Sequence, residues 1–163
     1  MRFDIFGEIW VKMDAGEYLV RRLERKDVDE KYFELLSDLT VAPVPEKERV
    51  DRLFSFMERH AETYHVFVVV QKSTQKIVGS GTLLVEHKFI RDLGKVGHIE
   101  DIVVLKEMQG EGLGKALVEH LAAYASEKGC YKTILACSEQ NAAFYEKCGF
   151  VRKEIEMAMY HKG

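Results

Sequence analysis

The chain has 163 residues, the length of one ordinary domain, which excludes two full domains. Hydrophobic residues make up 47% and charged residues 31%, so a disordered or fibrous chain is excluded as well. The net charge of −3 disfavours a nucleic-acid partner, and no apolar run is long enough to predict a membrane span. We therefore expect a single domain over residues 1–163, in the cytoplasm because residues 1–4 do not open a signal-peptide pattern.

Apolar periodicity predicts a strand, two helices and a hairpin in the first half of the chain. Pro43 and Pro45 fall between the two helical patterns and separate them. Asp27 stands near the start of the first helix, where an acidic side chain favours helix initiation. The elements expected here are a strand over 17–23, helices over 25–39 and 45–60, and hairpin strands over 64–71 and 76–86.

Strands and helices are predicted to alternate in the second half of the chain. The clearest helix has Leu113, Leu117 and Leu121 on one face, and Gly129 stands just past its end. The expected elements are strands over 96–105, 131–137 and 150–159, a long helix over 112–128 and a short helix over 140–147. The sum is an α/β (α+β) fold in which helices flank a mixed, mostly antiparallel sheet that the last strand closes.

A glycine-rich loop, QGEGLG at 109–114, follows a strand and opens the long helix. Glycines let the backbone approach an anion closely, and the free amides of a helix N-terminus attract negative charge. The segment therefore predicts a pyrophosphate site. Its spacing fits neither the Walker loop nor the dinucleotide fingerprint, and from spacing alone a simple tight turn is the alternative.

Two segments of the second half resemble the GCN5-related N-acetyltransferase superfamily. One is the loop Gln109-x-x-Gly112-x-Gly114 after a strand, and the other is NAAFYEKCGF at 141–150. The resemblance implies acetyl-CoA as co-substrate, with the pantetheine arm on the strand end and the pyrophosphate on the loop, and it implies no metal. The implied cofactor contacts are Ile102, Val103, Val104, Leu105, Gln109, Gly110, Glu111, Gly112, Leu113, Gly114, Lys115, Asn141 and Tyr145.

An acidic pair, Glu100 and Asp101, interrupts an otherwise apolar strand. Neighbouring strand residues point to opposite faces, so the two acids cannot both face the core. Carboxylates among apolar residues are costly to bury, which makes the pair a candidate for the reacting centre. The alternative is that one acid lies in solvent at an edge and the other is bound by backbone amides.

Three further stretches, EHKFIR at 86–91, GHIED at 97–101 and GCYK at 129–132, resemble the eukaryotic glucosamine-6-phosphate N-acetyltransferases of that superfamily. This resemblance implies acetyl transfer from acetyl-CoA to the amine of glucosamine 6-phosphate, giving N-acetylglucosamine 6-phosphate for UDP-GlcNAc biosynthesis. It also implies a homodimer in which Tyr131 and Lys132 reach the partner's site. The implied substrate contacts are Thr40, Lys88, Arg91, Glu100, Asp101, Tyr131 and Lys132.

The expected mechanism is direct attack of the amine, without a covalent enzyme intermediate, because the thioester is already activated. Glu100, directly or through a water shared with Asp101, takes the proton of the amine. The Ile102 backbone N–H stabilises the oxyanion if the strand bulges there. By resemblance, Tyr145 then stabilises or protonates the leaving thiolate.

Two positions depart from the family pattern. Ala136 stands where the family usually carries an acid, and Tyr160 stands where a family arginine meets the phosphate. Three alternatives stay open: another amine as acceptor, a non-catalytic acetyl-CoA-binding scaffold, and catalysis through Cys137 or Cys148 as nucleophile. The basic residues among the implied substrate contacts favour an anionic acceptor over a polyamine.

Overall fold

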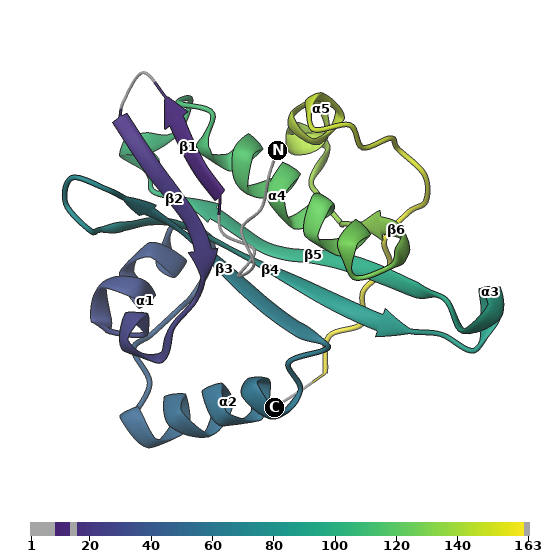
Figure 1. The fold of residues 1–163 in the computed structure, drawn as a ribbon, viewed down its shortest axis with the longest axis horizontal. Helices are drawn as coiled ribbons and strands as arrows, with labels where there is room; N and C mark the ends of the chain where they lie inside the picture. Colours follow the sequence, from purple (N-terminus) through teal and green to yellow (C-terminus); the bar gives the residue numbers. More distant parts are fainter. Residues whose placement is uncertain (1–8, 14–15, 162–163) are drawn as a thin grey trace.

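The computed structural model describes residues 9–13 and 16–161, which form a six-stranded sheet with helices packed on both faces (Figure 1). The strands lie in the order β1-β2-β3-β4-β5-β6, and all neighbours are antiparallel except β5 and β6. The predicted mixed, mostly antiparallel sheet flanked by helices is confirmed. The elements are β1 (Ile9–Met13), β2 (Gly16–Arg22), η1 (Arg25–Asp27), α1 (Glu30–Ser37), α2 (Lys47–Arg59), β3 (Tyr64–Gln71), β4 (Ile77–His87), α3 (Ile90–Leu93), β5 (Lys95–Val104), η2 (Lys106–Met108), α4 (Leu113–Glu127), β6 (Cys130–Ile134) and α5 (Glu139–Lys147).

The sheet carries an apolar cluster on each face because side chains alternate along its strands. In β3, Phe67 joins the cluster that α4 covers, whereas Val68 and Val70 join the cluster that α1 covers. A Cβ on Gly114 would lie 3.7 Å from the Val104 side chain, so the first turn of α4 packs closely on the end of β5. This packing holds the N-terminus of α4 beside that strand end.

The predicted helix over 25–39 is wrong in its first part. The Asp27 carboxylate accepts a hydrogen bond from Arg21 Nη1 at 2.6 Å, and only a 3-10 turn, η1, forms around it. α1 begins after Asp29, whose side chain accepts a hydrogen bond from the Tyr32 amide at 3.0 Å as the N-cap. β1 has no counterpart among the predicted elements, and the other strands and helix of this half match their predictions closely.

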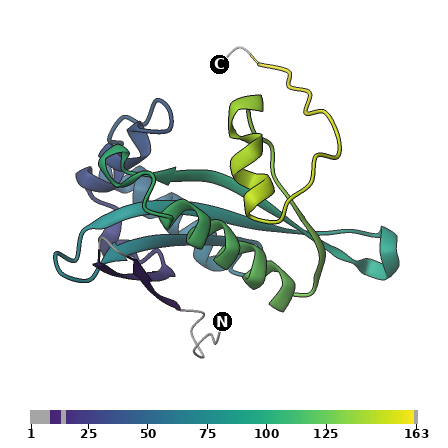
Figure 2. The ribbon, with the colours of Figure 1, turned by 90° about the horizontal axis from the view of Figure 1, so that it is seen from above.

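The predicted strand over 150–159 is wrong for this structure. Residues 150–161 leave α5 and run through solvent without a strand partner among the described residues (Figure 2). Phe150 still packs on the core, but the apolar side chains from Val151 onward are exposed, Ile155 by 91%. Alternation predicts the shape of a strand, but a strand also needs a neighbouring edge for its hydrogen bonds, and alternation does not identify that edge. The strand predicted over 131–137 is likewise shorter, because β6 ends at Ile134.

The remaining predictions for the second half, a strand and two helices, are confirmed as β5, α4 and α5. α3, in the turn between β4 and β5, has no predicted counterpart. None of the described helices combines the length and apolarity that a membrane crossing requires. Residues 1–4, on which the expected compartment rests, lie outside the described residues.

Candidate active site

A β-bulge in β5 brings the acidic pair to the surface. Between the pairs Glu100–Thr82 and Val103–Ser80, two residues of β5 share one position of β4. Asp101, the first of the two, has a positive φ of 53°, and both acids are exposed. The bulge on which the expected role of the Ile102 amide depends is therefore present. It explains how two consecutive acids both avoid the core.

Buried groups beneath the bulge support it. The hydroxyls of Tyr32 in α1 and Ser80 in β4 lie 3.0 Å apart, and Ser80 donates onward to a β3 carbonyl at 3.4 Å. Burial raises the pKa of Tyr32, and the Asp101 carboxylate raises it as well. A Cβ at Gly81 would stand 2.5 Å from the end of the Ile102 side chain, so glycine there makes room for Ile102. Tyr32 therefore reaches the underside of the site, a role that its helical spacing does not distinguish from core packing.

Glu100 has the electrostatic character of a general base. Burial raises the pKa of its carboxyl group, the Asp101 and Glu156 carboxylates raise it further, and His98 opposes them. The His98 ring is itself held, with Nε2 2.9 Å from a carboxylate oxygen of Glu86. A carboxylate with a raised pKa takes up a proton more readily, as a base acting near neutral pH requires.

Tyr145 brings a hydroxyl group from α5 to the same place. Its ring makes edge contacts with Phe144 at 4.9 Å and Phe150 at 6.3 Å between centroids. Burial raises the pKa of Tyr145, and the nearby Cys137, Cys148 and Glu100 raise it further. The hydroxyl therefore stays protonated at neutral pH and can donate a proton or a hydrogen bond.

The glycine loop before α4 has the geometry of an anion site. Gly110 and Gly112 have φ angles of 88° and 82°, which glycine adopts most readily, and a Cβ at Gly110 would meet no described atom within 4 Å. Gly112 is the N-cap of α4, and within the described chain no side chain caps this helix. The first-turn amides of Leu113, Gly114 and Lys115 therefore face outward at the positive end of the helix dipole. A pyrophosphate fits this helix end.

The edge of β5 beyond the acidic pair is open towards β6. β6 pairs with β5 only from Lys95 to His98, so among the described residues the later backbone of β5 has no strand neighbour on that side. An extended ligand arm fits along residues 102–105 in the way that an added strand would. Gln109, expected to contact the cofactor, instead donates from Nε2 to the Val104 carbonyl at 3.1 Å, which ties the loop to the strand end.

The remaining expected cofactor contacts differ in the exposure and the partners of their side chains. Asn141 is exposed on α5, and Glu111 is exposed in the glycine loop. Lys115 lies 3.7 Å from Glu119, which holds its ammonium one turn along α4. Leu113 is buried, so only its backbone can serve a ligand.

The expected substrate contacts fall into separate groups. Lys88 Nζ lies 2.7 Å from Glu86, and the Arg91 guanidinium lies over the Tyr131 ring at 5.6 Å, both near the end of the β4–β5 hairpin. Lys132 pairs with Val96, four residues before Glu100, which is about 13 Å along a strand. Thr40 lies on the loop after α1. One protomer therefore brings Glu100 close enough to Tyr145 to affect its pKa, whereas Lys132 lies well away along the sheet. Lys88 is linked to the Glu100 side of the site through Glu86 and His98.

The structure weakens the cysteine alternative for Cys148 and leaves it untested for Cys137. Cys148 donates from Sγ to the Phe144 carbonyl at 3.4 Å, and burial raises the pKa of its thiol. A thiol is a poor nucleophile until it loses its proton. Cys137 is exposed.

Among the described residues, no group of three His, Cys, Asp or Glu side chains is placed to hold a metal ion.

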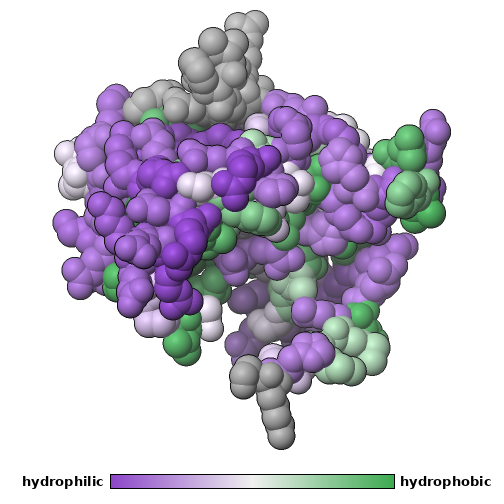
Figure 3. Space-filling view, turned by 90° about the horizontal axis from the view of Figure 1, so that it is seen from below, coloured by the Kyte–Doolittle hydropathy of each residue, from purple (hydrophilic) through white to green (hydrophobic). Residues whose placement is uncertain are grey.

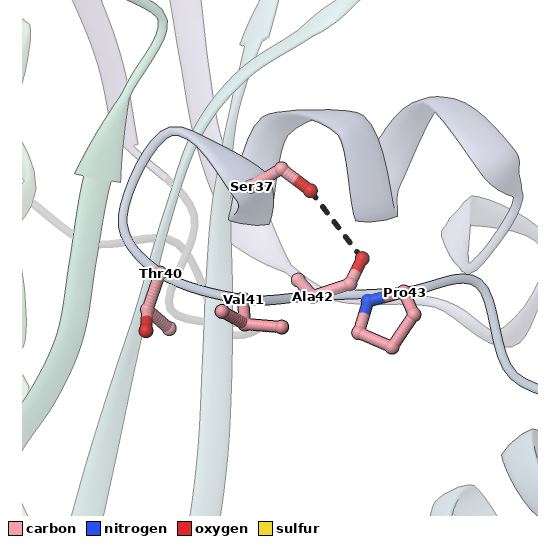
Figure 4. A pocket seen from close by; sticks show the side chains of 5 residues that line it. All are labelled: Ser37, Thr40, Val41, Ala42 and Pro43. Carbon is pink, nitrogen blue, oxygen red and sulfur yellow. Dashed lines mark hydrogen bonds between the residues drawn. The ribbon is translucent and has the colours of Figure 1, made fainter.

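A hollow of about 600 Å³ opens at the loop after α1 and is lined by Ser37, Thr40, Val41, Ala42 and Pro43 (Figure 4). The Ser37 hydroxyl donates to the Ala42 carbonyl at 3.3 Å, which folds the loop back on the helix. Asp38, in the same loop, contacts Lys106 just after β5. Neither Asp38 nor Lys106 is among the expected site residues, because pairing across so long a sequence separation leaves no local pattern.

Comparison with known proteins agrees with this geometry. The family model described as the acetyltransferase (GNAT) family matches residues 29–150. A glucosamine 6-phosphate N-acetyltransferase 1 from Dictyostelium discoideum is 44% identical over 140 residues, covering 86% of this chain and 88% of that protein.

Solved structures are similar as well. The glucosamine-6-phosphate N-acetyltransferase from Arabidopsis thaliana is 39% identical with a TM-score of 0.85, covering 89% of this chain and 99% of the other. An acetyltransferase from Trypanosoma brucei is 38% identical with a TM-score of 0.82, covering 88% of this chain and 99% of the other.

Proposed function

Because the chain belongs to the acetyltransferase (GNAT) family, we propose that it transfers the acetyl group of acetyl-CoA to the amine of glucosamine 6-phosphate. The product, N-acetylglucosamine 6-phosphate, is then a precursor for UDP-GlcNAc biosynthesis. The observation that carries this proposal is the bulge of β5, which exposes Glu100 and Asp101 on the strand whose end, at Val104, packs on the uncapped N-terminus of α4. The names of the similar proteins support the choice of acceptor.

Each part of the site has a defined task in this reaction. Acetyl-CoA supplies the acetyl group as an activated thioester. The amides of Gly112 to Lys115 bind the diphosphate, and the open edge of β5 orients the pantetheine arm. Glu100 accepts the proton of the attacking amine, the Ile102 N–H donates to the carbonyl oxygen, and Tyr145 donates to the sulfur.

The test is release of free thiol from acetyl-CoA with glucosamine 6-phosphate, glucosamine and a polyamine as separate acceptors. We expect rapid release with the sugar phosphate and much slower release with the two uncharged or cationic amines. Release that requires another amine would favour a different acceptor. Binding of acetyl-CoA without release would favour the scaffold, which Ala136 keeps open.

The active unit that we propose is a homodimer. Lys132 pairs with Val96, about 13 Å along the sheet from Glu100, and Arg91 lies over the Tyr131 ring, so we propose that a second copy supplies these two residues. Two apolar surfaces support this step. Phe89, Ile90 and Leu93, at the hairpin end, are exposed, Phe89 by 97%, and hydrophobic surface gathers at the right of Figure 3. Residues 151–160, which alternate apolar side chains in an extended backbone, can add as a strand to a partner's sheet.

A further inference from the structure

A two-point contact joins the loop after α1 to the end of β5. Asp38 Oδ1 lies 3.0 Å from the Lys106 ammonium, and Asp38 Oδ2 accepts a hydrogen bond from the Lys106 backbone amide at 3.3 Å. The hydrogen bonds and charge of Lys106 lower the pKa of the Asp38 carboxyl, so Asp38 is ionised at neutral pH. The ammonium and the backbone amide of Lys106 thus bind the two carboxylate oxygens of Asp38, and this two-point contact fixes the orientation of the loop.

Each end of this contact leads to a different region, the glycine loop on one side and the hollow after α1 on the other. Lys106 follows Leu105, whose amide donates to the Val78 carbonyl at 2.9 Å and so belongs to the rigid sheet. Lys106 then starts η2, which leads into the glycine loop. Asp38 precedes Thr40, which lines the hollow beside α1. The contact therefore connects the diphosphate side of the site with the hollow.

We propose that Asp38 is a positioning residue that couples the two sites: a ligand on residues 102–115 orders the loop at 39–46 through Lys106. Asp38 acts on the hollow at Thr40 through this loop and not by contact with a ligand. The identities of the two ligands, CoA and the amino sugar phosphate, rest on the proposed function. The contact from which we infer the coupling does not depend on those identities.

The 3-10 helix η2, which begins at Lys106, also contains the residue for a matched control. Glu107, next to Lys106 in η2, accepts a contact from Lys76 at 3.2 Å. Lys76 and Glu107 are both exposed, whereas in the other pair Lys106 is exposed and Asp38 is partly buried. The Lys76–Glu107 pair joins η2 to the β3–β4 turn and not to the loop after α1. Exposed ion pairs of this kind contribute little to stability, so neither pair is needed for folding.

Amide hydrogen exchange with and without CoA tests the coupling directly. In the wild type, CoA should slow exchange in peptides from 102–115 and from 39–46. In Asp38→Asn, CoA should still slow exchange at 102–115 but not at 39–46, and Lys76→Met should behave as the wild type. Loop protection that persists in Asp38→Asn, or that is missing in the wild type, overturns the proposal. If CoA slows exchange at neither 102–115 nor 39–46 in the wild type, both the cofactor site and the coupling are overturned.

Kinetics give a second readout. Asp38→Asn and Lys106→Met should each raise KM for glucosamine 6-phosphate by roughly two- to fivefold, the range of an exposed ion pair. The value of kcat and the melting temperature should stay close to those of the wild type. The exchanged pair, Asp38→Lys with Lys106→Asp, should recover part of the loss. An unchanged KM, or a joint fall of kcat and melting temperature, contradicts a positioning role.

Discussion

Glu100 and Tyr145 come from β5 and α5, yet the Glu100 carboxylate contributes to the raised pKa of the Tyr145 hydroxyl. The two groups therefore share one electrostatic environment. Burial raises both pKa values, which makes the carboxylate a better base and keeps the hydroxyl protonated. These are the two protonation states that transfer from a thioester to an amine requires at its start.

Glu100→Gln should remove the base. The rate of the wild type should fall as pH drops through the raised pKa of Glu100, because protonation abolishes its basicity. The variant should be roughly 100-fold slower or more and should lack this acidic limb. The measurement is kcat/KM between pH 5 and 8, with the exposed Glu107→Gln as control. A variant that keeps the wild-type pH profile would remove Glu100 from this role.

Tyr145→Phe should slow turnover and leave binding almost unchanged. The ring contacts with Phe144 and Phe150 survive the substitution, and only the proton donor is lost. We expect kcat to fall by about 100-fold, while calorimetry shows the same affinity for acetyl-CoA within about twofold. Tyr64→Phe, on β3 and away from the bulge, controls for loss of a hydroxyl. Turnover at the wild-type rate would contradict the assignment.

At the scale of elements, α4 and β3 bury two histidines between them. His65 and His120 are both fully buried, and their rings make edge contacts with Tyr124 at 5.2 Å and Phe67 at 4.6 Å. Burial lowers the pKa of each to about 4, and for His65 the guanidinium of Arg22 and the ammonium of Lys128 add to the effect. The helix α4, whose N-terminus forms the proposed anion site, therefore packs on β3 through imidazole rings that are neutral at pH 7.

Stability should therefore fall in acid. Above pH 6.5 both histidines are neutral whether folded or unfolded, and their effect is absent. Between pH 6.5 and about 4 only the unfolded chain gains the protons, so each histidine lowers the free energy of unfolding by about 1.4 kcal/mol per pH unit. Urea unfolding at pH 7.5, 6.0 and 5.0 measures this slope. His120→Gln should reduce it, and an identical slope would show that His120 does not titrate in this range.

At the scale of the whole molecule, the edges of the sheet determine which segments find a strand partner within one protomer. β6 pairs with β5 on one side and is the last strand of the sheet. The extended segment at 151–160 carries the apolar side chains of an added strand but lies in solvent in its own protomer. The proposed homodimer buries this segment and brings basic residues of one copy towards the acids of the other.

Replacing Ile155 and Met157 with aspartate should produce monomers. Two charges on the apolar side of the segment would have to be buried in the dimer, which is costly without partners. Light scattering should give twice the chain mass for the wild type and the single mass for the variant, with activity greatly reduced. Glu154→Gln is the control. A dimeric variant with normal activity would contradict the role of this segment.

Much of this architecture follows from local pattern. The apolar stripe of α4 and the strands β3 and β4 match their predictions, because each pattern reports backbone geometry within a few residues. Glu100 and Asp101 are candidates from the sequence for the same reason, since a charge inside an apolar strand can be recognised without knowing the fold, and their role stays a prediction. The late start of α1, after Asp29 and not at Arg25, is not predicted from the sequence, because it depends on the hydrogen bond between Asp27 and Arg21 of β2.

The sequence alone determined the fold class, the glycine loop and the acidic pair, since these depend on residue type and short spacing. Only the tertiary structure decided that β5 bulges at Asp101 over the Tyr32 hydroxyl, that Asp38 binds Lys106, and that the last alternating segment lies outside its own sheet. Each of these depends on which distant residue occupies the neighbouring position, and that information arises when hydrogen-bonding edges and charges are brought together in space.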